Sequence, residues 1–221
     1  MYNFIFNIPT KIHFGKDTIS SLSELKAYGS KVLLVYGGGS IKKNGLYDTA
    51  MKILKDAGLT VFELSGVEPN PKIETVRKGV EICKNEGIDM VLAIGGGSTI
   101  DCSKVVAAGA KYDGDAWDLV LDGSKVKAAL PIFDVLTLSA TGTEMDPFAV
   151  ISDMSKNEKW GTGSPYMVPT MSILNPEYTF SVSKKQTAAG TADMMSHTME
   201  NYFSMENADC QNLWQRDCYV Q

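Results

Sequence analysis

The amino-acid sequence predicts an α/β protein with a doubly wound, mostly parallel sheet that is covered by helices on both faces. Residues 31–36, after Lys31, and residues 90–94 are continuous apolar runs, which are typical of strands buried on both sides, and residues 132–137 continue the series. Segments with apolar residues at helical spacing lie between them. Strands that alternate with helices at this spacing favour βαβ units in a parallel sheet.

The N-terminal segment differs from these units. Residues 2–15 alternate apolar and polar side chains around Pro9, with Phe4, Phe6 and Ile8 on one side. Period-two alternation indicates strands rather than helix. We therefore predict two short strands joined at the proline.

The remaining elements follow from periodicity and from stop signals. A short strand is predicted at 61–64, and helices are predicted at 42–57, 73–86 and 99–110, with Gly58 ending the first helix. Residues 148–180 lose the helical period and contain several prolines, so they predict short strands and loops. A further helix is predicted from Ser183 towards the end of the chain.

Composition excludes several classes of protein. The chain has 221 residues and a net charge of −5, which disfavours nucleic acid and anionic membranes as partners. It shows neither an apolar run of the ~18 residues that span a bilayer nor a basic, then apolar, leader. The four cysteines form no C-x-x-C pair. Free thiols in a reducing cytoplasm are the favoured interpretation, with disulfides as the alternative.

Two glycine clusters each follow a predicted strand and precede a predicted helix. Glycine lets backbone N–H groups approach phosphate, and a helix N-terminus offers free donors and positive potential. Neither cluster has the G-x-G-x-x-G spacing, and a tight turn that needs positive φ is the alternative for each. Two clusters in successive units favour phosphate binding. The residues are Gly37, Gly38, Gly39 and Ser40 in the first cluster, and Gly95, Gly96, Gly97 and Ser98 in the second.

Five ordered segments carry a resemblance to a known family. Residues 95–104 (GGGSTIDCSK), 137–144 (TLSATGTE) and 189–197 (AGTADMMSH) resemble conserved stretches of the iron-containing (group III) alcohol dehydrogenases. Residues 36–42 (YGGGSIK) and 65–71 (SGVEPNP) are similar to the NADPH-dependent butanol dehydrogenase branch. The matches cover about residues 1–205, and they imply a Rossmann-like fold.

The resemblance implies where the cofactor lies. It places the pyrophosphate on the second glycine cluster, Asp101, Thr137, Ser139 and Thr141 along the cofactor, and Lys159 near the ribose beside the nicotinamide. Without the resemblance, Asp101 would be interpreted as a complement to a helix dipole, and Lys159 as a solvated surface lysine.

The first cluster bears on the choice of cofactor. NAD-preferring relatives place an Asp at the position of Gly39, where its carboxylate would repel a 2′-phosphate. Gly39 removes that charge, and Ser40 and Lys42 are candidate donors to a phosphate. We therefore expect NADP(H).

Asp193 and His197 are the predicted catalytic and metal-binding residues. Their i, i+4 spacing places both on one helix face, and a carboxylate with an imidazole suits iron or zinc. A surface ion pair is the alternative; the resemblance implies metal ligands. The family supplies two further histidines, whereas this chain has only His13 and His197. We expect His13 to face solvent or a partner chain, and the metal site to be incomplete.

These observations predict a dinucleotide-binding domain at 1–182 and the start of a truncated helical metal-binding domain at 183–221. The expected activity is that of an NADP(H)-dependent alcohol dehydrogenase or aldehyde reductase for primary alcohols such as butanol. A catalytically weak nucleotide-binding module is one alternative, and glycerol dehydrogenase-like or dehydroquinate synthase-like chemistry is another. The resemblance also implies a homodimer through the strands in residues 1–15.

Overall fold

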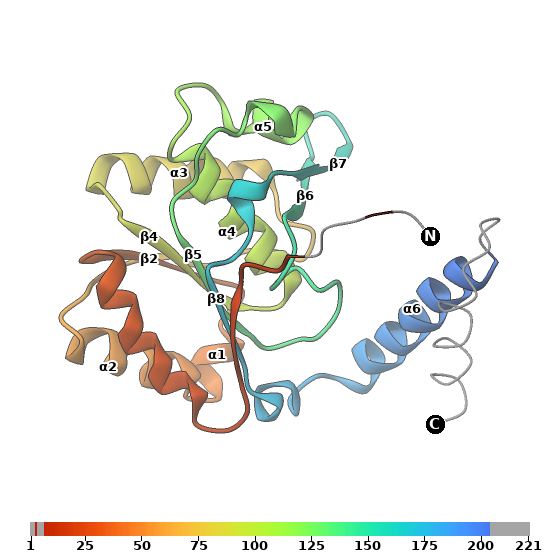
Figure 1. Ribbon diagram of the computed structural model, residues 1–221, viewed down its shortest axis with the longest axis horizontal. Helices are drawn as coiled ribbons and strands as arrows, with labels where there is room; N and C mark the ends of the chain where they lie inside the picture. The colour runs from red at the N-terminus through yellow and green to blue at the C-terminus, as the bar shows by residue number, and fades with distance from the viewer. Residues whose placement is uncertain (1–2, 4–6, 204–221) are drawn as a thin grey trace. The chain divides into compact units, whose positions relative to one another are not determined.

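Six strands form one parallel sheet in the order β1-β8-β5-β4-β2-β3 (Figure 1). The computed structural model describes residue 3 and residues 7–203. The chain divides into two units, residues 1–180, which hold the sheet, and residues 181–221. The strands are β1 Lys11–Phe14, β2 Lys31–Tyr36, β3 Thr60–Leu64, β4 Met90–Gly95, β5 Ile132–Leu136 and β8 Met171–Leu174. The predicted fold class is confirmed.

Helices cover both faces of this sheet, as the continuous apolar runs predict. Leu33 and Val35 of β2 pack into a core with α3 Ile73–Glu86, α4 Gly97–Gly109 and α5 Ala116–Leu121. The alternate side chains of β2 pack on the opposite face with η1 Thr18–Tyr28, α1 Ser40–Lys43 and α2 Leu46–Asp56. Figure 1 shows these two helical layers on either side of the sheet.

The prediction of one continuous helix at 42–57 was wrong, because the structure has two helices there. Helix α1 ends at Lys43, and α2 begins at Leu46. Gly45 has φ of 78°, a left-handed conformation that glycine adopts without steric strain. The Leu46 amide donates to Oδ1 of Asn44 over 3.2 Å, so the side chain of Asn44 bonds to the chain beyond the break. The Asn-Gly pair therefore acts as a turn, which the apolar spacing alone concealed.

The N-terminal prediction is confirmed in part. The second predicted strand is β1, which lies at the sheet edge and pairs with β8, Lys11 opposite Met171. The Thr10 hydroxyl donates to the carbonyl of Pro169 over 2.7 Å and closes the same junction. The first predicted strand, with Phe4 and Phe6, lies outside the described residues.

Residues 148–180 form short strands and loops, as predicted. Strands β6 Phe148–Asp153 and β7 Glu158–Gly163 make an antiparallel hairpin. Short 3₁₀ turns η3 Pro165–Met167 and η4 Pro176–Thr179 lie before and after β8, and a further one, η2 Gly123–Lys125, lies between α5 and β5. Strand β8, which follows η3, returns the chain to the main sheet.

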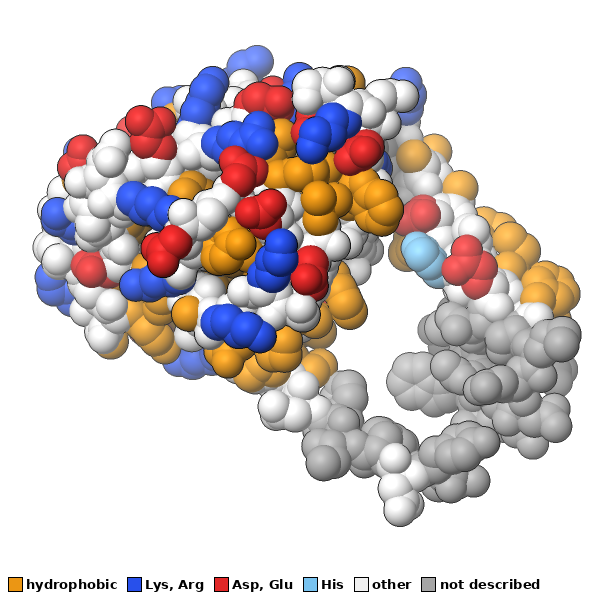
Figure 2. All heavy atoms as spheres, turned by 90° about the horizontal axis from the view of Figure 1, so that it is seen from above, with side chains coloured by type: hydrophobic (Ala, Val, Ile, Leu, Met, Phe, Trp, Pro, Cys, Tyr) orange, Lys and Arg blue, Asp and Glu red, His pale blue; other side chains and the backbone are white. Residues whose placement is uncertain are grey.

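The second unit contains α6 Lys184–Tyr202, close to the helix expected from Ser183. Its apolar side chains are exposed, among them Met194, Met199 and Phe203, the last with 73% of its surface accessible. Within residue 3 and residues 7–203, no helix combines the length and the apolar character needed to cross a bilayer. On the face shown in Figure 2, acidic and basic side chains alternate without an extended basic patch.

Candidate functional site

The two glycine clusters lie where the strand order of the sheet reverses. From β2 the chain moves outward to β3 and then returns to place β4 on the other side of β2. The reversal therefore lies between β2 and β4, and these are the strands that the clusters follow. Ligands of open α/β sheets bind at this kind of switch point, beyond the carboxyl ends of the strands.

The second cluster leads directly into the N-terminus of α4. Gly95 ends β4, Gly96 is the N-cap, and α4 begins at Gly97 with no side-chain cap. A Cβ on Gly95 would lie 2.5 Å from Oγ1 of Thr99, so this glycine lets the helix pack closely on its strand. A Cβ on Gly97 would meet only Thr141 and Thr143, at 3.5 Å or more. An uncapped helix end with little side-chain bulk around it can receive an anion.

In the first cluster, only Gly37 lies close to other parts of the chain. A Cβ on Gly37 would lie 3.3 Å from the carbonyl oxygen of Val67, and Gly38 faces open space. Gly39 has φ of 98° and no atom within 4 Å of an added Cβ. The positive φ of Gly39 fits the alternative interpretation, a tight turn between strand and helix. The open space around Gly39 also leaves room for a ligand. Ser40, the first residue of α1, is exposed.

Lys42, a predicted phosphate donor, already has partners within the chain. Its ammonium lies 4.9 Å from the ring centroid of Tyr36, 4.4 Å from that of Tyr47 and 3.9 Å from Oε2 of Glu63. The Tyr36 and Tyr47 hydroxyls donate to the two oxygens of Glu63 over 2.6 and 2.8 Å. These bonds, that of Tyr36 first, hold the pKa of Glu63 below its ordinary value against the opposing effect of burial.

Asp101 ties the second cluster to the rest of its unit. Thr143 donates from its hydroxyl to Oδ1 over 2.6 Å, and the Val150 amide donates to Oδ2 over 3.0 Å. Burial raises the pKa of Asp101, and these two hydrogen bonds oppose that effect. Both carboxylate oxygens therefore have protein donors, and the side chain anchors the loop after β5 and the start of the hairpin to α4.

Lys104 lies one helical turn further along α4 and is fully buried. Its ammonium contacts the Thr143 hydroxyl, the Asp146 carboxylate and the carbonyls of Asp146 and Phe148, each at 2.8 Å. Burial lowers the pKa of Lys104, and Asp146 opposes that effect. The lysine therefore holds residues 143–148 against α4.

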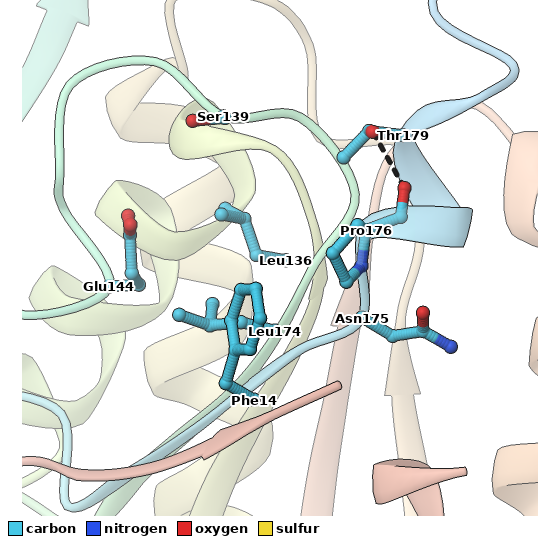
Figure 3. A pocket seen from close by; sticks show the side chains of 8 residues that line it. All are labelled: Phe14, Leu136, Ser139, Glu144, Leu174, Asn175, Pro176 and Thr179. Carbon is cyan, nitrogen blue, oxygen red and sulfur yellow. Dashed lines mark hydrogen bonds between the residues drawn. The ribbon is translucent and has the colours of Figure 1, made fainter. Parts of the chain in front are cut away.

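A pocket of about 260 Å³ opens at the carboxyl ends of three neighbouring strands (Figure 3). Phe14 ends β1, Leu136 ends β5 and Leu174 ends β8, and their side chains lie together in the pocket. Ser139, one of the predicted cofactor residues, lines it with Glu144, Asn175, Pro176 and Thr179. The glycine clusters lie outside its lining, since they follow the next strands of the sheet.

The other predicted cofactor residues lie along the same edge. The Thr137 amide donates to the carbonyl of Gly95 over 2.9 Å, which holds the strand ends of β5 and β4 together. Thr141 is exposed and is the nearest neighbour of an added Cβ on Gly97. This segment therefore borders the second cluster, and its predicted contact with the cofactor stays a prediction.

Lys159 and Ser98 are brought together by a residue that the sequence analysis did not single out. The Lys159 ammonium donates to Oδ1 of Asn70 over 2.7 Å, and the Asn70 amide donates to Oγ of Ser98 over 3.3 Å. Asn70 has φ of 54°, which asparagine tolerates better than most residues. The Pro-Asn-Pro sequence at 69–71 was a signal for such a turn.

Asp193 and His197 face each other on α6, with 3.7 Å between Oδ1 and Nε2. Glu200 approaches the other ring nitrogen, also at 3.7 Å. All three side chains are exposed. Among the described residues, no cluster of three or more His, Cys, Asp or Glu is arranged to hold a metal ion. His13, expected to face solvent or a partner chain, is partly buried: Ser21 lies 3.0 Å from Nδ1 and Glu24 lies 3.4 Å from Nε2, and the partner-chain alternative stays a prediction.

Lys104 and Glu63 were also missed as site residues, although each carries a sequence signal. Lys104 is the one charged residue in the run SKVVAAGA, and Glu63 interrupts the apolar strand VFEL. A charge inside an apolar run predicts either a solvent-facing position or a buried partner. A solvent-facing charge and a buried, paired charge can be distinguished only from the partners that distant segments of the chain contribute.

Comparisons with known proteins show the family of the chain. Residues 9–176 match the family model described as iron-containing alcohol dehydrogenase. The chain is 62% identical over 205 residues to NADH-dependent butanol dehydrogenase A of Clostridium acetobutylicum, covering 92% of this chain and 53% of the relative. It is 40% identical over 205 residues to the NADPH-dependent aldehyde reductase YqhD of Escherichia coli, covering 91% and 52%.

A solved structure shows the same fold. The crystal structure of NADH-dependent butanol dehydrogenase A from Thermotoga maritima matches with a TM-score of 0.87 and 49% identity. The match covers 92% of this chain and 52% of that one. The chain thus spans about half the length of these relatives.

Proposed function

Because the chain belongs to the iron-containing alcohol dehydrogenase family, we propose that it binds the nicotinamide dinucleotide of an alcohol dehydrogenase or aldehyde reductase. The expected substrates are primary alcohols and aldehydes such as butanol and butanal. The observation that carries the proposal is the pair of glycine clusters at the carboxyl ends of β2 and β4, on either side of the switch point.

Each part of the site has a role in this proposal. The uncapped N-terminus of α4, with Gly95, Gly96, Gly97 and Ser98, binds the pyrophosphate through backbone N–H groups. The pocket beside Ser139 takes the adenine, because its Phe14, Leu136 and Leu174 side chains offer an apolar surface. Lys159 lies on the nicotinamide side and binds ribose. Asp101, through its hydrogen bonds to Thr143 and Val150, holds the loop after β5 and strand β6 against α4.

The bound nicotinamide supplies the hydride chemistry, and the protein supplies binding and orientation. Asp193 and His197 offer a carboxylate and an imidazole on one helix face, which fit part of a divalent-metal site. Catalytic metal sites commonly use three protein ligands and an open position. These two residues do not complete such a site.

A Gly97→Asp variant tests cofactor binding without disturbing the fold. An aspartate in the first turn suits the helix dipole, and the added Cβ makes only ordinary contacts. Its carboxylate would repel the pyrophosphate. We expect unchanged or higher thermal stability together with loss of NAD(P)H binding in a calorimetric titration. Gly97→Ala is the size control and should retain most of the binding. Equal affinity of Gly97→Asp and the wild type would remove the second cluster from the site.

The preferred cofactor is a separate part of the proposal. We propose NADP(H), because Gly39 leaves no carboxylate beside a 2′-phosphate. NADH is the second candidate, because the relative at 62% identity is named NADH-dependent, whereas the relative at 40% is named NADPH-dependent. Titration of the 221-residue chain with each cofactor decides between them.

Turnover assays separate the function classes. Reduction of butanal, measured with and without added Zn²⁺ or Fe²⁺, supports the dehydrogenase when activity depends on metal. Cofactor binding with no turnover supports the nucleotide-binding module, and oxidation of glycerol in preference to butanol supports glycerol dehydrogenase-like chemistry. The domain division at 182/183, homodimerisation and a cytoplasmic location belong to the same proposal.

A further inference from the structure

We propose that Glu63 tunes the choice between NADPH and NADH by competing with a cofactor phosphate for Lys42 beside the first glycine cluster. This inference rests on the proposed function, and it deepens it by naming a residue that determines specificity. Glu63 comes from β3, Lys42 from α1 and Tyr47 from α2, so three elements build the arrangement around the end of β2. Glu63 is a positioning residue, because it acts on the cofactor through the lysine and through its charge.

The position of the Lys42 ammonium links it to the cluster. Lys42 belongs to the first turn after Gly39, and its amide donates to the Gly39 carbonyl over 3.1 Å. Its side chain folds back over the ring of Tyr36, the residue immediately before Gly37. The ammonium is therefore tied to residues on both sides of the cluster. About half of the side-chain surface remains exposed, so a ligand can still reach it.

The carboxylate of Glu63 is held more firmly than the lysine. Two phenol hydroxyls donate to it, and the rings of Tyr36 and Tyr47 pack edge to face with centroids 5.7 Å apart. The ion pair with Lys42 is long, at 3.9 Å. The lysine can therefore shift towards a new anion, while the carboxylate stays in place.

These charges act in opposite directions on a cofactor phosphate. Lys42 attracts a 2′-phosphate, whereas Glu63 competes for the lysine and repels the phosphate. A 2′-hydroxyl carries no charge, so NADH binding responds to neither residue to a comparable extent. The pair therefore sets the ratio of the two affinities rather than the strength of cofactor binding as a whole.

Calorimetric titration of three variants with NADPH and NADH tests the inference. We expect Glu63→Gln to raise the NADPH affinity about fivefold relative to NADH, the size of one charge interaction near water. Lys42→Met should lower the same ratio by a similar factor. In the double variant, the effect of Glu63→Gln should shrink, because the lysine through which it acts is absent. The control is Glu81→Gln, an exposed residue of α3 on the opposite face of the sheet.

The outcomes are distinguishable. A purely structural role for Glu63 would weaken both cofactors together and leave the ratio unchanged, which overturns the inference. A lower ratio in Glu63→Gln also overturns it. Failure of the wild-type chain to bind either cofactor contradicts the proposed function instead. Thermal melting of each variant identifies any that are unfolded, and Glu63→Asp, which keeps the charge, should restore a ratio near that of the wild type.

Discussion

Asp134 lies inside β5 with none of its surface exposed. The Ser172 hydroxyl is 2.6 Å from Oδ2 of Asp134 and 2.7 Å from the carbonyl oxygen of Glu144. One hydroxyl proton cannot serve both acceptors. Protonation of Asp134 would resolve this, since the carboxyl could then donate to Ser172 while Ser172 donates to Glu144. Burial, followed by the nearby Glu144 charge, raises the pKa of Asp134 well above its ordinary value.

The raised pKa of Asp134 predicts how stability depends on pH. A carboxyl whose pKa is raised on folding binds more protons when folded, so its stabilising effect is lost as pH rises from the unfolded pKa near ~3.9 through the folded value. Asp134→Asn removes that titration. As pH rises, we expect the free energy of unfolding of Asp134→Asn to increase relative to that of the wild type. Urea denaturation across this range measures it, with exposed Asp113→Asn as control. A constant difference between Asp134→Asn and the wild type would contradict it.

Lys104 provides a second test at the residue scale. Its four contacts at 2.8 Å hold the segment that contains Thr143, Asp146 and Phe148 against α4. Lys104→Met keeps a long side chain but removes the charge and the donors. Leaving buried acceptors unpaired should cost about 3 kcal/mol in the free energy of unfolding. Chemical denaturation measures the loss. The exposed Lys111→Met should change stability little, and a similar small change at Lys104 would argue against this role.

At the scale of elements, α3 and α4 approach each other through glycines. An added Cβ on Gly79 of α3 would lie 2.7 Å from Cγ2 of Val106 and 2.8 Å from Cδ2 of Leu64. An added Cβ on Gly109 of α4 would lie 2.6 Å from Cγ2 of Val80. The two helices therefore fit ridge into groove only because each contributes a residue without a side chain. This close contact fixes the position of α4, whose N-terminus carries the second glycine cluster.

Gly79→Ala tests that contact. Alanine is the better helix former by about 1 kcal/mol, whereas overpacking a filled core costs about 1–3 kcal/mol. We expect a net loss of about 1 kcal/mol in the free energy of unfolding and weaker cofactor binding, because α4 must shift. Exposed Lys78→Ala, one position earlier on the same helix, should be neutral. A stabilised Gly79→Ala would show that propensity outweighs packing here.

At the scale of the whole molecule, β1 leaves one edge of the sheet without a described neighbour. Ile12 and Phe14 on this strand are exposed, Phe14 with 71% of its surface accessible. An open edge with apolar side chains favours pairing with another chain unless it is covered. The homodimer through residues 1–15 stays a prediction, and residues 1, 2 and 4–6 of that segment lie outside the described part.

Ile12→Lys tests the dimer. A lysine on the edge strand is a common way to prevent such pairing, and Ile12 lies outside the main cores. We expect the wild type to scatter light as a dimer at micromolar concentration and Ile12→Lys to shift towards the monomer. Leu121→Lys, an exposed apolar residue at the end of α5, is the matched control. A wild type that is monomeric in this range would refute the prediction.

The sequence by itself determined the strands β2, β4 and β5, the limits of α3 and the family, because these depend on local apolar periodicity and on contiguous motifs. Residues 73–86 form a helix with the predicted bounds. The tertiary structure decided which strands border one another and which charges are buried. Thr10 bonds to Pro169 at a separation of 159 residues, and Lys104 contacts Phe148 at a separation of 44. Such contacts join two residues that are distant in the sequence and that packing across the sheet brings together. A short stretch of sequence contains only one of the two residues. For the same reason, Lys42 was predicted from its position beside Gly39, whereas its link to Glu63 emerged only once β3 lay beside β2.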